Sequence, residues 1–243
     1  MKKITVVLAD DHAVLREGLR LLLQTTHDIA VVGEADDGHR TLTAVKKLQP
    51  DVVLLDIAMP LLNGLEAARR IALEVPATKV LILSAYHDHQ HVQQALDAGA
   101  SGYLTKQISS DDLFDAIREI SAGKASFSPP IARCLSQQWR DGTSPFTTTR
   151  APALTTRQTE VVQLIAEGFS SKQIAGVLRL SQKTVGKHRE AIMAKLDIHE
   201  IASLTRYAVF TGVVESNYIP LWPATHIDTP GQGPVEAARF KRR

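Results

Sequence analysis

One short stretch, Asp51 to Pro60, constrains the fold more than any other part of the chain. Its sequence, Asp-Val-Val-Leu-Leu-Asp-Ile-Ala-Met-Pro, sets four apolar residues, two of them β-branched, between Pro50 and a turn. Such a run predicts a strand that is buried on both faces of a parallel sheet. Asp56 follows it directly, where doubly wound folds place their ligand crevice. From this stretch alone, Asp56 as a cap of the next turn is the alternative.

The same alternation of strand and helix recurs on both sides of this stretch. Besides the strand before Asp56, strands are predicted at 4–9, 29–34, 79–84 and 101–106, and a helix pattern follows each of the five. Ser110 is the predicted cap of the last of these helices. Alternating strands and helices indicate a doubly wound, five-stranded parallel sheet of the flavodoxin-like kind. We therefore expect an α/β domain over residues 1–124.

Polar residues stand at the carboxyl ends of the predicted strands. Asp10 and Asp11 end the first strand, Asp56 the third, Ser84 the fourth and Lys106 the fifth. Carboxylates that lie so close repel one another unless a hard divalent cation lies between them, and Mg²⁺ is the natural occupant. With the lysine ammonium and the hydroxyl on the other side, the crevice would hold a phosphoryl group on the third-strand aspartate.

The charge of the chain is divided unevenly between its halves. Residues 1–125 carry 13 Lys and Arg against 17 Asp and Glu, whereas residues 126–243 carry 15 against 9. An acidic first half and a basic second half predict that only the second half meets a polyanion. Proline-rich sequence predicts a linker at 125–152, and residues 215–243 have the composition of a disordered tail.

The second half contains dense helix signals from residue 154 onward. Thr155 with Gln158 and Ser170 with Gln173 have capping-box spacing, and Ser181 is the predicted cap of a third helix. A fourth helix is predicted at about 200–210. Short helices joined by tight turns predict a small all-α domain over 153–214. Polar positions of the third helix form its outer face, for which ordinary solvated charge is the alternative reading.

Several classes of protein are excluded or disfavoured. The single cysteine, Cys134, excludes an internal disulfide and suits a reducing cytoplasm. The apolar run 4–9 is too short for a signal peptide, and no run reaches membrane-spanning length, so we expect a cytoplasmic protein that does not bind a membrane. No G-x-G-x-x-G pattern follows the first strand, which disfavours a dinucleotide site.

The first domain resembles the receiver domain of two-component response regulators over residues 3 to about 124. The resemblance rests on four ordered motifs: Asp10-Asp11, Asp56-Ile57-Ala58-Met59-Pro60, Ser84-Ala85 and Gly102-Tyr103-Leu104-Thr105-Lys106. It implies that Asp56 accepts phosphate from a sensor histidine kinase. It also implies that Mg²⁺ is bound by Asp11 and Asp56 directly, by the backbone carbonyl of Ala58, and by Asp10 mainly through water.

The resemblance further implies a switch in the same domain. Ser84 would follow the phosphate on activation, and Lys106 would also contact the phosphoryl oxygens. Tyr103 would rotate between exposed and buried positions. A simple half-buried strand aromatic is the alternative for Tyr103.

The second domain resembles the LuxR-type helix-turn-helix over residues 152 to 214. The motifs are Leu154-Thr155-Thr156-Arg157-Gln158, Leu164-Ile165-Ala166-Glu167-Gly168, Ser171-Lys172-Gln173-Ile174-Ala175 and Leu180-Ser181-Gln182-Lys183-Thr184-Val185, with Lys187-His188 to Lys195-Leu196. The resemblance implies that the helix from 182 to about 195 enters the major groove. The expected DNA contacts are Lys172, Lys183, Thr184, Gly186, Lys187 and Glu190. The sequence departs from the family at Arg179, where a turn glycine is usual, and at Gly186, which weakens the helix by about 1 kcal/mol relative to Ala.

Together the two resemblances describe a response regulator of the NarL/FixJ type. This would be a phosphorylation-regulated transcription factor rather than a conventional enzyme, with double-stranded DNA, a sensor histidine kinase and a second copy as partners, and RNA polymerase as a further candidate. In this class the receiver can cover the DNA-binding surface until phosphorylation shifts the population. One alternative is a Mg²⁺-dependent aspartyl phosphatase of the haloacid dehalogenase type, whose signature needs a second aspartate where Ala58 stands. The other is a DNA-binding regulator that does not depend on phosphorylation.

Overall fold

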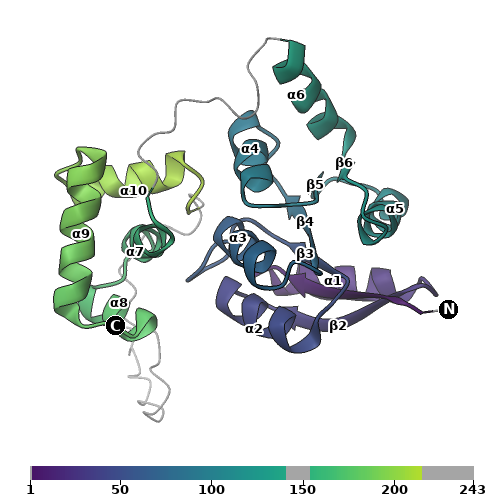
Figure 1. Cartoon of the computed structure of the whole chain (residues 1–243), viewed down its shortest axis with the longest axis horizontal. Helices are drawn as coiled ribbons and strands as arrows, with labels where there is room; N and C mark the ends of the chain where they lie inside the picture. Colours follow the sequence, from purple (N-terminus) through teal and green to yellow (C-terminus); the bar gives the residue numbers. More distant parts are fainter. Residues whose placement is uncertain (1, 141–153, 215–243) are drawn as a thin grey trace, which may run out of the picture.

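The structure is a computed structural model that describes residues 2–140 and 154–214 (Figure 1). Its first domain contains a wholly parallel sheet with the strand order β2-β1-β3-β4-β5-β6. The strands are β1 (Ile4–Ala9), β2 (Ile29–Ala35), β3 (Val52–Leu55), β4 (Lys79–Ser84), β5 (Gly102–Thr105) and β6 (Ser126–Phe127). The doubly wound parallel fold is confirmed, but the predicted count of five strands is wrong because β6 extends the edge beside β5.

Helices cover both faces of this sheet. They are α1 (Ala13–Gln24), α2 (Gly38–Leu48), α3 (Gly64–Glu74), α4 (His89–Asp97), α5 (Ser110–Ser121) and α6 (Pro129–Arg140). One apolar core joins the sheet to α2, α3, α4 and α6, and the other joins it to α1 and α5. All four residues of β3 are buried, as a central parallel strand requires.

The register of the central strands brings the acidic residues together. Ala9 of β1 lies beside Leu55 of β3, so that Asp10 and Asp56 leave the same edge of the sheet from neighbouring strands. The amide of Asp56 donates to the carbonyl of Ala9 at 2.8 Å, which continues the ladder by one residue. Backbone hydrogen bonds alone therefore fix the carboxyl ends of these two strands relative to each other.

Two details of the first domain differ from the sequence expectations. Ser109, not Ser110, is the N-cap of α5, and its hydroxyl accepts from the amide of Asp112 at 3.2 Å. The segment 125–152, predicted as a linker, begins with β6 and α6, and Ile131 of α6 is fully buried in the core of the first domain. Pro129 and Pro130 start this helix, since proline suits the first turn, where its missing N–H is not needed.

The second domain consists of four helices around one apolar core. They are α7 (Thr156–Ala166), α8 (Ser171–Leu178), α9 (Gln182–Leu196) and α10 (Ile201–Phe210). Both predicted capping boxes are present, and Ser181 caps α9 as predicted. Arg179 adopts the left-handed conformation, with φ 53°, that glycine usually provides at this turn. The predicted tail lies outside the described residues, and no helix of the described part is long and apolar enough to cross a membrane.

We expect Gly186→Ala to stabilise the second domain by about 1 kcal/mol, because glycine inside a helix carries that penalty. Apart from the chain neighbours and the backbone of its own helix, nothing described lies within 4 Å of the place that a Cβ at Gly186 would take, and the same is true of Gly176 in α8. Chemical unfolding of the full chain measures the change, with Gly176→Ala as the matched control. If Gly176→Ala stabilises the protein and Gly186→Ala does not, α9 is not a regular helix at residue 186.

Candidate functional site

Three charged groups meet at the carboxyl edge of the sheet. The Lys106 ammonium lies 2.8 Å from Asp56 Oδ2 and 2.9 Å from Asp10 Oδ2, and both aspartates are 3% exposed. Burial opposes the charge on Lys106, but the charge of Asp56 and hydrogen bonds to both aspartates outweigh it and raise the pKa of Lys106. The lysine is therefore a permanent cation shared by two buried carboxylates. The structure thus brings together Asp10, Asp56 and Lys106 as the sequence predicts.

Asp11 and His12 complete an oxygen-rich cluster at this edge. In the described part of the chain, ligand atoms of Asp10, Asp11, His12 and Asp56 all lie within 4.8 Å of one another. Burial raises the pKa of Asp11, and the charge of Asp10 adds to the effect although His12 opposes it. Two buried oxygens of the cluster face nitrogen atoms, since Lys106 Nζ lies 2.9 Å from Asp10 Oδ2 and His12 Nδ1 lies 2.9 Å from Asp11 Oδ1. This donor set fits a hard divalent cation such as Mg²⁺.

Sequence reasoning did not include His12 in this cluster. Its Nδ1 lies 2.9 Å from Asp11 Oδ1 and 3.2 Å from Asp10 Oδ1. The only signal in the sequence is its position directly after the two aspartates, which does not reveal the direction of the side chain.

The loop between β3 and α3 begins at Asp56 and includes Ala58. Asp56 Oδ1 accepts from the amide of Ile57 at 2.9 Å. The loop closes tightly at its other end, since a Cβ at Gly64 would lie 1.9 Å from the carbonyl oxygen of Asp56. Asn63 caps α3 there by accepting from the amide of Glu66, as its spacing predicts. Ala58 is therefore held in a short, closed loop next to the acidic cluster.

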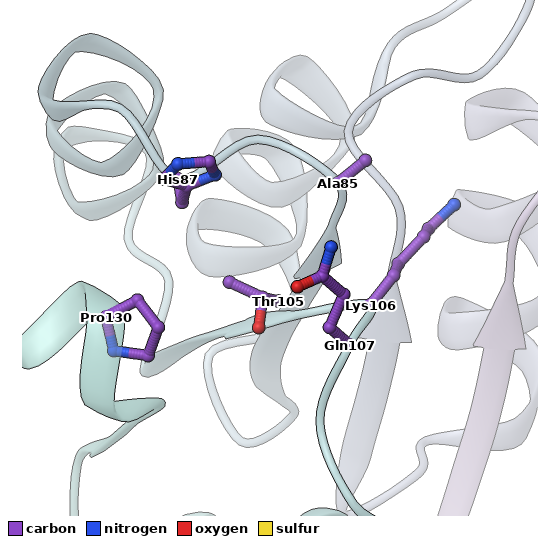
Figure 2. Close-up of a pocket in the computed structure, with 6 residues that line it drawn as sticks. All are labelled: Ala85, His87, Thr105, Lys106, Gln107 and Pro130. Atoms are coloured by element: carbon purple, nitrogen blue, oxygen red, sulfur yellow. The ribbon is translucent and has the colours of Figure 1, made fainter.

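Ser84 and Tyr103 are linked through the backbone of Tyr86. The Ser84 hydroxyl accepts from the amide of Tyr86 at 3.1 Å, and the Tyr103 hydroxyl donates to its carbonyl at 2.9 Å. Tyr103 is fully buried rather than half-buried. A pocket of about 330 Å³ lies beside this region, between Lys106 and α6 (Figure 2), and its lining is Ala85, His87, Thr105, Lys106, Gln107 and Pro130. The loop after β4 is therefore loosely packed on the side that faces Lys106.

The ring of Tyr86 is linked to the second domain through His91. It stacks on His91 of α4 with ring centroids 4.3 Å apart and planes 5° from parallel. His91 Nδ1 lies 2.6 Å from Asp88 Oδ2, which fixes the imidazole. Gly212, just after α10, approaches so closely that a Cβ there would lie 2.3 Å from His91 Nε2. The backbone of Tyr86, which contacts both Ser84 and Tyr103, is thus connected to Gly212 of the second domain through the stacked rings of Tyr86 and His91.

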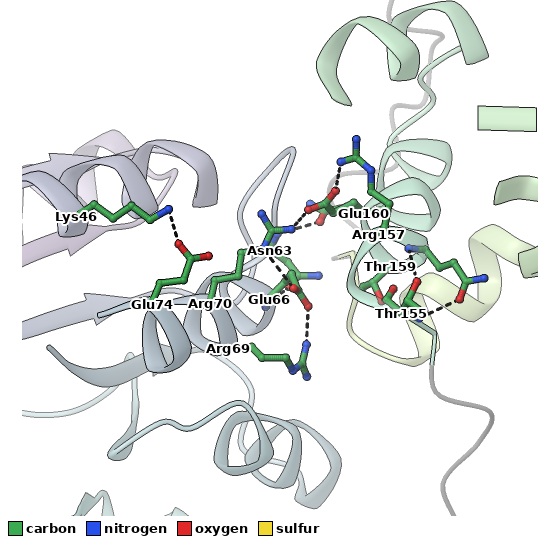
Figure 3. A network of polar contacts seen from close by, with 12 residues as sticks. Lys46, Asn63, Glu66, Arg69, Arg70, Glu74, Thr155, Arg157, Thr159 and Glu160 are labelled. Atoms are coloured by element: carbon green, nitrogen blue, oxygen red, sulfur yellow. Dashed lines mark hydrogen bonds and ion pairs between the residues drawn. The ribbon is translucent and has the colours of Figure 1, made fainter. Parts of the chain in front are cut away.

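A polar network joins α3 of the first domain to α7 of the second (Figure 3). Arg70 contacts Glu66 in its own helix and Glu160 in α7, and Arg157 also pairs with Glu160. Both glutamates are 1% exposed. A carboxylate buried at this contact is costly without its cation, so loss of either arginine would destabilise the observed pairing of α3 with α7.

Two side chains of α7 hold the loop that follows Asp56. The Gln163 amide donates to the carbonyl of Met59 and accepts from the amide of Asn63, both at 2.9 Å. Glu167, the C-cap of α7, accepts from the amide of Leu61 at 3.2 Å. Burial raises the pKa of Glu167 to about 7, although its hydrogen bonds with Gln163 and Leu61 work in the opposite direction. Sequence reasoning found none of these contacts.

The contact around Glu167 should weaken as the pH rises. Glu167 has a pKa of about 7 when it is docked, and we expect a value nearer 4.5 when it is free, so docking favours the protonated form. Docking should therefore be strongest below the free pKa and lose up to about 3 kcal/mol as the pH rises from there through the docked pKa. Amide exchange of residues 59–63, corrected for intrinsic rates, measures this between about pH 5 and pH 8. Glu167→Gln is the control and should show no such trend, and equal protection of the wild type at both pH values would contradict the prediction.

The predicted DNA contacts lie mainly on exposed surface. Lys183, Lys187 and Glu190 of α9 are exposed, and so is Lys172 of α8. The Thr184 hydroxyl lies 2.8 Å from the Ser181 hydroxyl and so belongs to the cap of α9. The contacts with the first domain involve α7 and residues 211–213, whereas α9 lies on the far side of the second domain (Figure 1). The structure therefore differs from the expected masking, because the first domain does not cover the outer face of α9.

Two protein-family models match the chain. The model for the response regulator receiver domain matches residues 6–118, and the model for bacterial regulatory proteins of the luxR family matches residues 152–208. A Bacillus subtilis protein named uncharacterized transcriptional regulatory protein YxjL is 36% identical over 214 residues, covering 88% of this chain and 98% of that protein. Transcriptional regulatory protein DegU of Brevibacillus brevis is 35% identical over 211 residues, covering 82% and 89%.

A solved structure is similar over most of the same length. It is RcsB from Salmonella enterica serovar Typhimurium, bound to promoter rprA in the presence of phosphomimetic BeF₃⁻. The TM-score is 0.52 at 26% sequence identity, and the match covers 84% of this chain and 98% of that one. The similarity thus spans both domains.

Proposed function

This chain belongs to the DNA-binding response regulators of two-component systems, in which a receiver domain precedes a LuxR-type helix-turn-helix, and we propose that Asp56 is its phosphoacceptor. The observation that carries the proposal is the buried Asp56 carboxylate with the Lys106 ammonium 2.8 Å away. A phosphoryl group on Asp56 adds negative charge at this point, and a fixed cation is what stabilises it. Ser84, at the end of the next strand, is the hydroxyl proposed to bind a phosphoryl oxygen.

Mg²⁺ is the proposed cofactor of this step. Asp11, Asp56 and the backbone carbonyl of Ala58 would bind it directly, and Asp10 would act mainly through water. The support is the cluster of carboxylates from Asp10, Asp11 and Asp56, whose ligand atoms lie within 4.8 Å of one another. A divalent cation bound there would neutralise charge on the phosphoryl oxygens. The role of this chain is to hold the carboxylates and Lys106 in place.

A sensor histidine kinase is the proposed phosphodonor. The phosphoryl group would leave the imidazole nitrogen of the kinase as its P–N bond breaks, and a P–O bond would form to a carboxylate oxygen of Asp56. Because the acceptor is a residue of the chain itself, we propose that the protein undergoes this step rather than turning over a substrate. Repeated hydrolysis of phosphate esters by the purified chain would instead favour the aspartyl phosphatase alternative.

The second domain is proposed to bind double-stranded DNA through α9, as a dimer on paired half-sites. The exposure of Lys183, Lys187 and Glu190 on one helix of a basic domain supports this. We further propose that the protein acts in the cytoplasm, where its DNA would be, with RNA polymerase as a further partner. Selection of bound fragments from genomic DNA by the phosphorylated protein would identify the operator.

We expect Lys187→Ala to weaken operator binding by about 1 to 3 kcal/mol if the lysine contacts a base, and the variant should then discriminate less between bases at one position of the operator. If the lysine contacts mainly phosphate, the variant should bind all DNA sequences more weakly by the same factor. The slope of log K against log salt concentration should then fall in magnitude by about 1. Glu190→Ala should reduce discrimination more than affinity, because a carboxylate can accept from cytosine N4 but is repelled by the DNA backbone.

Binding isotherms over a salt series, on operator and on scrambled DNA, separate these outcomes. Lys124→Ala, which removes an exposed lysine from the receiver, is the control for net charge. Wild-type binding by folded Lys187→Ala and Glu190→Ala proteins would show that α9 does not read the major groove.

A further inference from the structure

We propose that Gln163 of the DNA-binding domain is a positioning residue for phosphorylation of the receiver. By holding the β3–α3 loop, it opposes the rearrangement that Mg²⁺ binding and phosphorylation at Asp56 require. The inference rests on the proposed function, and it assigns to α7 a direct influence on the chemistry of the other domain.

Every polar atom of the Gln163 side chain is used at this contact. Its Nε2 donates to the carbonyl of Met59 at 2.9 Å and to Glu167 Oε1 at 2.7 Å, while its Oε1 accepts from the amide of Asn63 at 2.9 Å. The residue is 1% exposed. A buried amide with all its partners in place is costly to move, because each partner left behind is an unsatisfied polar group. Gln163 therefore fixes both ends of the loop segment 59–63.

The loop has a conformation that needs such support. Leu61 has φ 66°, in the left-handed region that residues other than glycine rarely adopt. Its amide donates to Glu167 at 3.2 Å, so the second domain also holds the strained residue itself. Strain of this kind persists where surrounding contacts enforce it. Release of the domain would allow the loop to relax.

The position of Lys106 gives the direction of the effect. While Gln163 holds the loop, Lys106 contacts Asp10 Oδ2 and Asp56 Oδ2 together. A divalent cation bound by Asp56 would compete with Lys106 for this carboxylate. Ala58, whose carbonyl would join that cation, precedes Met59, which Gln163 holds. The hold of Gln163 on the loop therefore favours the arrangement in which Lys106 contacts both aspartates, and by reciprocity Mg²⁺ should loosen that hold.

The test compares two Gln→Leu variants of the full chain. Gln163→Leu removes the loop contacts, whereas Gln94→Leu removes a hydrogen bond from α4 to the carbonyl of Thr211 elsewhere in the same interface. We expect Gln163→Leu to bind Mg²⁺ about fivefold more tightly than wild type, measured by calorimetry without phosphodonor, and Gln94→Leu to show a much smaller change. The amides of Leu61 and Asn63 should exchange faster in Gln163→Leu, and in wild type when Mg²⁺ is added.

Gln163→Asn is the second variant, since it keeps the amide but is too short to reach the loop, and it should behave as Gln163→Leu does. Unchanged or weaker Mg²⁺ binding by the folded variants would overturn the inference, and so would unchanged exchange of the Leu61 and Asn63 amides. Phosphorylation of Asp56→Asn protein would instead overturn the proposed function. The calorimetric result does not depend on phosphotransfer, so the two failures are distinguishable.

Discussion

Asp56→Asn is expected to abolish phosphorylation of the full chain while the fold survives. An amide has nearly the same shape as the carboxylate and keeps an oxygen that can accept from the Ile57 amide. It lacks the nucleophilic oxygen that would form the bond to phosphorus. Intact mass measured after incubation with acetyl phosphate and Mg²⁺ should show one added phosphoryl group on the wild type and none on the variant.

Asp51→Asn is the matched control for this experiment. Asp51 stands directly before β3, at the end of the strand opposite to Asp56. Its carboxylate accepts from the amide and the hydroxyl of Thr5 at 2.8 and 2.7 Å. The control should therefore be phosphorylated like the wild type. Undiminished labelling of Asp56→Asn would contradict the assignment and move the acceptor elsewhere, with Asp10 as a candidate.

Asp11→Ala is expected to raise the Mg²⁺ concentration needed for phosphorylation by about tenfold or more, because it removes a direct ligand of the proposed cation. Loss of an outer-shell partner already costs metal sites about 10- to 100-fold in affinity or activity. The measurement is the extent of labelling over a Mg²⁺ series.

Glu17→Ala is the control for this second prediction, since it removes an exposed carboxylate of α1 outside the acidic cluster. It should leave the Mg²⁺ dependence unchanged. An unchanged dependence in Asp11→Ala as well would mean that the cation binds without Asp11.

The parts of the fold that have strong local signals were predictable from the sequence. β3 and Asp56 follow from an apolar run and its end, and the caps at Asn63, Thr155, Ser170 and Ser181 follow from their spacing. β6 was not predictable, because two residues carry no periodic signal. α6 was not predicted as an element of the first domain for another reason, since Pro129-Pro130 resembles a linker although prolines are compatible with a helix start.

The contact between the domains was not predictable, because each of its polar groups resembles ordinary surface until its partner is known. Arg70, Gln163 and Glu167 each find their partner in the other domain, far away in the sequence. A weak signal existed in α7, whose sequence from Val161 to Ala166 is apolar at every position except Gln163. A helix with such an apolar run needs cover on more than one side, and the four-helix core supplies only part of it.

The exposed outer face of α9 changes how phosphorylation would act. Because the receiver contacts α7 and the segment after α10, it leaves the proposed DNA contacts of α9 uncovered while fixing the domain in one orientation. Paired half-sites require two such domains at a defined spacing. We therefore propose that phosphorylation acts by releasing the docked domain so that two copies can take up that spacing.

The most direct test is the affinity of the full chain for its selected operator, measured with and without acetyl phosphate and Mg²⁺, for the wild type and for Asp56→Asn. We predict that phosphorylation tightens binding of the wild type and leaves the variant unchanged. Equal affinity of the wild type under both conditions, in a sample that mass measurement shows to be phosphorylated, would contradict a phosphorylation switch and favour a regulator that does not depend on phosphate.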